Sequence, residues 1–234
     1  MKKLKFIFSV LVVAFCALMS GVIMYYDFAA EPTAATADEY PLIIIDAGHG
    51  GFDGGAVASD GTSEKDINLN IASTLSELFR ASGKQVVMTR STDTGTEDNS
   101  ADIISKRKVS DLKNRLKLIN TYENAIFVSV HLNKFTTASA NGTQVFYSKN
   151  HSKSRDLGQC VQNSVVSQLQ KNNTRVIKQA TSSTYLLHNA QIPAVIVECG
   201  FLSNKEELKK LKSDEYQKQM AYSIFCGVLK YLEK

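Results

Sequence analysis

The chain has 234 residues, of which 44% are hydrophobic and 21% charged, and its formal net charge is +4. This length and composition allow one domain with a substantial core and exclude wholesale disorder. The mild positive charge excludes the dense basic surface that is typical of nucleic-acid-binding proteins.

The N-terminal segment carries a targeting signal. Three lysines among the first five residues precede an uncharged run, residues 6–26, whose length suits a helix that crosses a bilayer. Positive charge ahead of such a run places the rest of the chain outside the cytoplasm. Residues 1–27 are therefore predicted to be either a signal peptide, cleaved near Ala35-Thr36-Ala37, or an uncleaved membrane anchor. Both interpretations predict an exported domain.

A linker is predicted next, because residues 28–40 are rich in alanine and threonine and contain Pro32. The folded domain is predicted to span residues 41–234. It begins with an aliphatic run, residues 42–45, of the kind that a strand buried on both faces requires.

A helix is predicted after this strand. Hydrophobic residues recur at helical spacing over residues 67–79, and Ser63 with Asp66 resembles a capping box at the start of the helix. A second strand is predicted at residues 85–89. A strand, a loop, a helix and a strand in this order are typical of a parallel sheet.

The alternation of strands and helices continues towards the C-terminus. The polar residues 91–107 are predicted to form a long surface loop. Further helices are predicted at residues 110–122, 152–171 and 214–232, and further strands at 125–133, 142–148, 174–180 and 192–200. The chain is therefore predicted to be a single α/β domain with a mostly parallel, roughly six-stranded sheet flanked by helices, preceded by the N-terminal apolar helix.

The four cysteines, Cys16, Cys160, Cys199 and Cys226, are widely spaced and contain no CxxC pair. They do not resemble a disulfide framework, although a single disulfide stays open. Cys199 follows Glu198 in a predicted strand, so its side chain should point to the opposite face, as a buried structural thiol.

Polar residues end three of the apolar strands. His49 follows the first strand, His131 ends the run IFVSVH, and Glu198 ends the run AVIVE. Because the carboxyl ends of parallel strands meet at one edge of a sheet, these side chains are expected to lie close together. Glu64, near the start of the first helix, is a fourth candidate. Two imidazoles and a carboxylate form many catalytic zinc sites, and a further glutamate can serve as general base.

Each of these residues also has a structural interpretation. A single histidine at a strand end is more often a hydrogen-bonded structural residue than a functional one. Glu64 could simply be an acid in the first turn of a helix, where the helix dipole favours it. Glu198 is harder to explain in this way, since a carboxylate in a buried strand needs a partner or a shifted pKa. Taken together, the four residues favour a metal site.

The glycine-rich loop GHGGFDGG, residues 48–55, is also compatible at first sight with a phosphate site. It lacks the Gly-Lys-Ser/Thr ending of a phosphate-binding loop, and Asp53 stands where a dinucleotide-binding motif needs its third glycine. The glycines are therefore interpreted as allowing positive φ angles and a close approach of the backbone to a metal site.

Four motifs, in order, resemble the signature segments of the zinc-dependent N-acetylmuramoyl-L-alanine amidases of bacteria. They are DAGHGGFDGGA (46–56), SEKDINL (63–69), FVSVHLN (127–133) and PAVIVECGFLSN (193–204). The resemblance covers nearly all of residues 41–234, which would then be the catalytic domain. It implies that His49, Glu64 and His131 bind one zinc ion and that Glu198 is the catalytic acid/base.

The segment NRLKLIN, which contains Arg115 and Asn120, also matches a family pattern, of a structural kind. Arg115 and Asn133 are in addition candidates for contact with the substrate. The short chain with one catalytic domain is similar to the germination-specific amidases of spore-forming bacteria.

This similarity implies hydrolysis of the amide bond between the lactyl group of N-acetylmuramic acid and L-alanine in peptidoglycan. The expected setting is the spore cortex, where the reaction is a step towards the muramic-δ-lactam needed for germination. The expected location is the outer face of the cytoplasmic membrane, the cell wall or the cortex, in the intermembrane space of the forespore. A lipoprotein partner is implied by some clostridial relatives.

Two other functions stay open at this point. A zinc peptidase that cuts within the stem peptide would use the same four residues. A non-catalytic, membrane-tethered wall-binding or regulatory module would need none of them, and the intact set of four argues against it.

Overall fold

The computed structural model describes residues 40–98 and 103–234. The signal peptide or anchor predicted for residues 1–27 and the linker predicted for residues 28–40 lie outside the described residues, apart from Tyr40. None of the helices in the described part combines the length and the apolarity that a membrane span needs.

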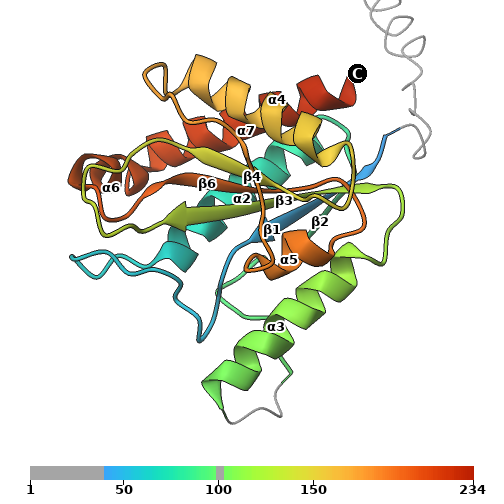
Figure 1. Cartoon of the computed structure of the whole chain (residues 1–234), viewed down its shortest axis with the longest axis horizontal. Coiled ribbons are helices and arrows are strands. Elements are labelled where there is room, and N and C mark those ends of the chain that lie inside the picture. The colour runs from blue at the N-terminus through green and yellow to red at the C-terminus, as the bar shows by residue number, and fades with distance from the viewer. Residues whose placement is uncertain (1–39, 99–102) are drawn as a thin grey trace, which may run out of the picture. The chain divides into compact units, whose positions relative to one another are not determined.

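A six-stranded sheet forms the centre of the domain (Figure 1). Its strands are β1 (Leu42–Ala47), β2 (Val86–Met88), β3 (Ala125–Asn133), β4 (Gln144–Tyr147), β5 (Lys178–Gln179) and β6 (Ala194–Phe201). Their order is β2-β1-β3-β6-β4-β5, and the first four are mutually parallel. β4 runs antiparallel to β6, and β5 is parallel to β4. The prediction of a mostly parallel, six-stranded α/β sheet is confirmed.

Helices cover both faces of this sheet. On one face lie α2 (Glu64–Ala81), α4 (Ser154–Gln168), α6 (Lys205–Leu211) and α7 (Asp214–Leu232), and on the other lie α3 (Ile104–Ile119) and α5 (Tyr185–Asn189).

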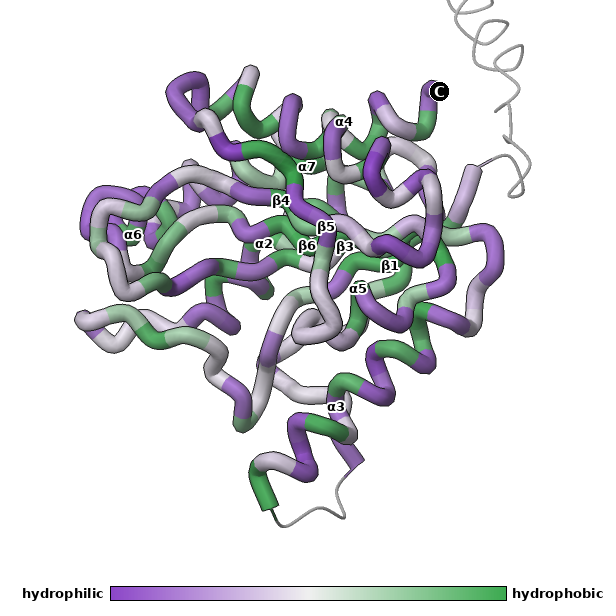
Figure 2. The backbone as a smooth tube through the Cα atoms, in the orientation of Figure 1, coloured by the Kyte–Doolittle hydropathy of each residue, from purple (hydrophilic) through white to green (hydrophobic). Residues whose placement is uncertain are grey.

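The strands supply apolar side chains to both layers. Ile43 and Ile45 belong to the larger core under α2, α4 and α7, whereas Ile44 belongs to the smaller core under α3 and α5. Side chains of a strand alternate between its faces, so a continuous aliphatic run fits a strand covered on both sides. Figure 2 shows hydrophobic residues concentrated along the sheet and on the helix sides that meet it.

Helix α3 begins at Ile104, inside the segment 91–107 that was predicted to be a surface loop. Its first half does not pack on the sheet: Ile104 and Val109 are more than half exposed. The hydrophobic periodicity that reveals a buried helix is therefore missing from this half, and only the part after residue 110 shows it.

The start of α2 also differs from its prediction. Ser63 occupies the N-cap position, but its side chain makes no capping hydrogen bond and instead donates to the carbonyl oxygen of Gly54 at 2.8 Å. Ser63 thus joins the glycine-rich loop to the helix. The strand predicted at residues 174–180 is only two residues long, and the short helices α5 and α6 lacked a sequence pattern long enough to reveal them.

Candidate metal centre

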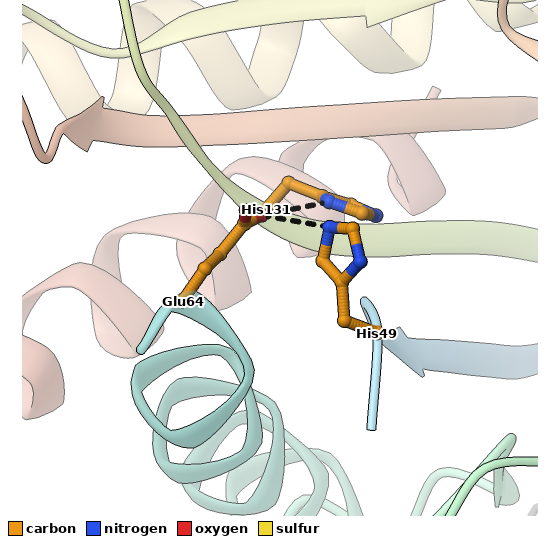
Figure 3. Close-up of side chains that lie close together, drawn as sticks. All are labelled: His49, Glu64 and His131. Atoms are coloured by element: carbon orange, nitrogen blue, oxygen red, sulfur yellow. Dashed lines mark hydrogen bonds and ion pairs between the residues drawn. The ribbon is translucent and has the colours of Figure 1, made fainter. Parts of the chain in front are cut away.

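Three side chains from separate parts of the chain meet at the carboxyl ends of the parallel strands (Figure 3). His49 lies in the loop after β1, Glu64 is the first residue of α2, and His131 lies near the end of β3. The donor atoms of the three lie within 4.8 Å of one another. The Glu64 Oε1 atom is 3.2 Å from His49 Nε2 and 3.0 Å from His131 Nδ1.

The glycine-rich loop holds His49 in an unusual backbone conformation. His49 has a φ angle of 63°, and it is the only non-glycine residue with a positive φ among the described residues. Such a conformation costs free energy and persists where the surrounding structure enforces it. An added Cβ atom at Gly48 would lie 2.3 Å from the His131 ring, and one at Gly55 would lie 2.6 Å from Glu64 Oε2. The glycines therefore allow the backbone to pass directly beside two of the clustered side chains.

Two buried arginines hold the backbone of this loop through hydrogen bonds. Arg115 donates a hydrogen bond to the carbonyl oxygen of His49 at 2.7 Å, and Arg90 donates one to that of Gly48 at 3.0 Å. Both also donate to the carbonyl oxygen of Ala47. These bonds fix the backbone on which the His49 ring depends, and they satisfy carbonyl groups that burial would otherwise leave unpaired.

The charge of Arg115 is balanced inside the protein. Its guanidinium contacts Asp46 Oδ1 at 2.5 Å and Asp111 Oδ2 at 2.8 Å. Burial of Asp46 favours the neutral acid, but Arg115, together with weaker contributions that include the Ser129 hydroxyl, lowers the pKa of Asp46 to about 2. Since the Arg115 side chain is only 2% exposed, this geometry makes it a support of the loop and leaves it no surface for the predicted substrate contact.

Glu64 is held as a carboxylate. Its burial favours the neutral acid, but its hydrogen bonds with His131 and His49 keep its pKa well below the usual range. Its Oε2 atom also accepts a hydrogen bond from the amide of Ala56 at 2.8 Å, and Oε1 accepts one from the amide of Leu132 at 3.0 Å. The carboxylate is thus charged and fixed in direction before any cation binds.

Asp53 orients the ring of His49. The His49 Nδ1 atom lies 2.8 Å from Asp53 Oδ2, so Nδ1 carries the proton and Nε2 faces Glu64. Lys108, on α3, contacts the other Asp53 oxygen at 2.8 Å. Burial lowers the pKa of His49, but the hydrogen bonds to Asp53 and Glu64 outweigh it and raise the pKa to about 9. A cation at Nε2 would replace the proton that these carboxylates otherwise favour.

Glu198 lies beside the cluster. It is the register partner of His131 on the neighbouring strand β6, and its Oε2 atom is buried with no hydrogen-bond partner in the described part of the chain. Burial, reinforced by the charge of Glu64, raises the pKa of Glu198 to about 6 against the opposing effect of His131. Cys199 belongs to the core on the opposite face, as its alternation with Glu198 predicted.

The donor set fits a zinc ion. Two imidazole nitrogens and one carboxylate oxygen are a common ligand set of catalytic zinc, which keeps its fourth position open. A buried carboxylate oxygen without a partner, on Glu198, is available on the adjacent strand for a water molecule or a reacting group.

The remaining sequence candidates lie outside the cluster. Asn133 is partly buried two residues beyond His131 and lines a neighbouring groove. Asn120 links α3 to the segment before β6, because its amide donates to the carbonyl oxygen of Asn189 and accepts from the amide of Gln191. Its role is structural, as the family pattern implied. The described cysteines, Cys160, Cys199 and Cys226, are all free.

Sequence reasoning missed four residues that support the cluster: Asp46, Asp53, Asn68 and Arg90. Asp46 had a detectable signal, since it is a charge at the end of an aliphatic run that must be buried. The hydrogen bond of Asn68 to Glu64 follows the spacing of four residues on a helix. Arg90 has no comparable signal, because its partners are backbone carbonyls in a distant loop.

Comparison with known proteins agrees with this geometry. The profile of the N-acetylmuramoyl-L-alanine amidase family matches residues 43–230. The chain is 36% identical, over 190 residues, to the germination-specific N-acetylmuramoyl-L-alanine amidase of Bacillus subtilis (strain 168). The aligned region covers 81% of this chain and 79% of the relative.

Solved structures share the fold. The CwlD amidase from Clostridioides difficile, in complex with the GerS lipoprotein, matches with a TM-score of 0.80 and 40% identity, covering 82% of this chain and 98% of that one. The amidase AmiC2 of Nostoc punctiforme matches with a TM-score of 0.71 and 30% identity, covering 84% of this chain and 98% of that one.

Proposed function

The chain belongs to the N-acetylmuramoyl-L-alanine amidase family, and on this basis we propose that it is a zinc-dependent enzyme that acts on the spore cortex. It hydrolyses the amide bond between the lactyl group of N-acetylmuramic acid and L-alanine. The germination-specific relative supports a role in germination, and the proposed setting is the spore cortex, with a step towards muramic-δ-lactam as the purpose.

One observation carries this proposal: three potential zinc ligands converge within 4.8 Å, beside a buried carboxylate oxygen that lacks a partner. His49 and His131 offer Nε2 and Nδ1, and Glu64 offers Oε1. When bound there, zinc supplies Lewis acidity towards water and the scissile carbonyl.

Glu198 moves the proton. As a carboxylate it accepts a proton from the water that attacks the lactyl carbonyl, and it then donates this proton to the departing amine of L-alanine. A pKa of about 6 suits both directions of transfer near neutral pH. The fixed Glu64 carboxylate and the Asp53-oriented His49 ring keep the ligand atoms in place during these steps.

The cellular setting follows from the substrate. Peptidoglycan lies outside the cytoplasm, so the domain works as an exported protein, tethered to the membrane if residues 1–27 are retained. The complex of the Clostridioides difficile relative with a lipoprotein supports a lipoprotein partner for this chain as well.

The test is digestion of a purified disaccharide-peptide by the full-length protein, with the products weighed by mass spectrometry. An amidase releases a peptide that starts at free L-alanine together with a peptide-free sugar. A zinc peptidase would instead leave a shortened peptide on the muramic acid. Absence of hydrolysis with zinc and a candidate lipoprotein both supplied would favour a non-catalytic module.

A substitution tests the role of Glu198. Glu198→Gln should keep zinc and fold but lose turnover by about 100- to 10,000-fold, the usual contribution of a general acid/base. Glu206→Gln, which removes an exposed carboxylate on α6, is the matched control and should retain full activity. Full activity of Glu198→Gln would eliminate the proposed proton transfer.

A further inference from the structure

A groove of about 440 Å³ lies next to the candidate metal centre. The loop after β3 forms one wall, and the segment that leads into β5 forms the other. Its lining includes Asn133, Phe135, Gln144, Phe146, Arg175 and Lys178. Phe146 packs in the core on the α3 and α5 side, so the groove opens on the sheet face that also carries Glu198.

Gln144 connects this groove with the proposed acid/base. Gln144 and Glu198 are register partners on β4 and β6, which places their Cβ atoms about 5 Å apart on the same face. The Gln144 side chain is itself held in place: Nε2 donates to the carbonyl oxygen of Val176 at 2.8 Å, and Oε1 accepts from Arg175 Nη1 at 3.1 Å. The Arg175 guanidinium is therefore separated from Glu198 by a single side chain.

Two positive charges line the groove, and the acid that acts on one of them, Glu207 near Arg175, does not line it. Arg175 is fixed by a hydrogen bond from Nε to the carbonyl oxygen of Asn141 at 2.6 Å and by stacking over the ring of Phe201, 4.6 Å from the ring centre. Lys178 is exposed. Among the described residues, no ion pair uses either cation, and no acidic side chain lines the groove.

We propose that this groove binds the peptide on the L-alanine side of the scissile bond and that Arg175 and Lys178 select peptides with free carboxylates. The inference rests on the proposed function, which supplies the bond that is cut. The cations favour the peptide over the glycan, because carboxylates on the peptide can accept charge-assisted hydrogen bonds whereas amide and hydroxyl groups of the sugar are neutral. The exposed ring of Phe135 adds an apolar surface for small side chains of the peptide.

The experiment compares two disaccharide-peptides that differ only in whether the peptide carboxylates are free or amidated. We expect the full-length protein to prefer the free acid by about tenfold in kcat/KM, with the difference in KM. In the double variant Arg175→Gln/Lys178→Gln, KM for the acidic substrate should rise about tenfold, so that the preference for the acidic over the amidated substrate is lost.

Control variants separate charge from structure. Arg175→Lys keeps the positive charge and should retain much of the preference. Lys178→Gln alone leaves the hydrogen bonds of Arg175 intact, and Lys218→Gln removes another exposed lysine from α7, on the opposite face of the sheet. Zinc content and thermal unfolding of each variant report whether the centre and the fold are preserved.

A binding measurement keeps this inference separate from the proposed function. The acidic peptide that begins at L-alanine should bind the full-length protein in calorimetry, and the double variant should lose that binding. If the protein hydrolyses neither substrate yet binds this peptide through the two cations, the proposed function fails and the groove assignment stands. Equal kinetics on both substrates, a preference that survives in the double variant, or peptide binding that the double variant retains would each overturn the assignment.

Discussion

The orientation of the His49 ring is fixed by residues outside the cluster of candidate ligands. Asp53 accepts a hydrogen bond from His49 Nδ1–H, which leaves Nε2 as the ligand atom that faces Glu64. Arg115 holds the carbonyl oxygen of the same residue, and the positive φ angle turns the side chain towards His131. At this scale the site depends on orientation: an imidazole binds a cation only when its lone pair points at it.

Replacing Asp53 should therefore weaken metal binding. We expect Asp53→Ala to reduce zinc affinity by about 10- to 100-fold, because the His49 ring loses the acceptor that fixes its tautomer and direction. The measurement is a competition titration of the metal-free protein with a zinc-binding dye. Asp60→Ala, which removes an exposed aspartate paired with Lys212, should keep the affinity of the parent. An unchanged affinity in Asp53→Ala would contradict the orienting role.

The pH dependence of turnover should follow Glu198. Burial raises its pKa to about 6, so the carboxylate that accepts the proton is populated above this pH and is lost as the pH falls through it. We expect kcat/KM to decrease about tenfold per pH unit on the acid side. A bound cation favours the carboxylate form of Glu198 and moves this acid limb of the pH profile of kcat/KM to lower pH. The limb should be missing from the residual activity of Glu198→Gln, and its persistence there would assign it to another group.

At the scale of elements, the site is made of loop and strand ends that two arginines hold together. Arg90 lies two residues after β2 and Arg115 lies on α3, and both donate to carbonyl groups at the end of β1 and in the loop that follows it. The glycine-rich loop has little apolar surface with which to pack, so these bonds and its ion pairs replace a hydrophobic anchor. Breaking one partner of a buried pair such as Asp46 and Arg115 costs about 3–5 kcal/mol, because the other charge stays buried and uncompensated.

The glycine-rich loop packs so closely against β3 that adding a single methyl group at Gly48 should disturb the site. In Gly48→Ala the new Cβ atom would stand 2.3 Å from the His131 ring, which must move away. A displacement of this size should lower kcat/KM by about 100-fold or more. Zinc content and activity are measured beside Gly158→Ala, whose Cβ atom on α4 meets its nearest neighbours at an ordinary 3.5 Å. A Gly48→Ala enzyme as active as the Gly158→Ala enzyme would show that the ring position is not critical.

For the molecule as a whole, the candidate metal centre joins segments that the sequence keeps far apart. The His49 loop, the start of α2 and the end of β3 are brought to one edge of the sheet by the parallel order of β1 and β3. A ligand that binds all three segments only in the folded state stabilises the whole domain.

Metal removal should therefore lower the melting temperature. Zinc at 100 times its dissociation constant stabilises the folded state by about 2.7 kcal/mol, or about 5–10 °C in Tm for a domain of this size. Differential scanning calorimetry of the full-length protein with zinc and with a chelator tests this. His49→Ala should show no response to zinc. His151→Ala should respond like the parent, since His151 borders a cavity at the opposite end of β3, beside Ala125.

The sequence by itself determined the α/β class and the bounds of β3 and α7, and it singled out the four residues that lie together at the carboxyl ends of the strands. Buried positions recur every few residues along a strand or a helix. The hydrophobic pattern of neighbouring residues such as Ile43, Ile44 and Ile45 therefore indicates that they are buried. A carboxylate inside such a run, as at Glu198, stands out for the same reason.

Only the tertiary structure decided which polar groups meet. Asp46 and Arg115 are 69 positions apart, and nothing in their local patterns pairs them. The reversed direction of β4, the exposed first half of α3 and the groove beside Gln144 likewise depend on how distant segments pack. Pairing of charges and direction of strands are properties of positions in space, whereas hydrophobic periodicity is a property of neighbours along the chain.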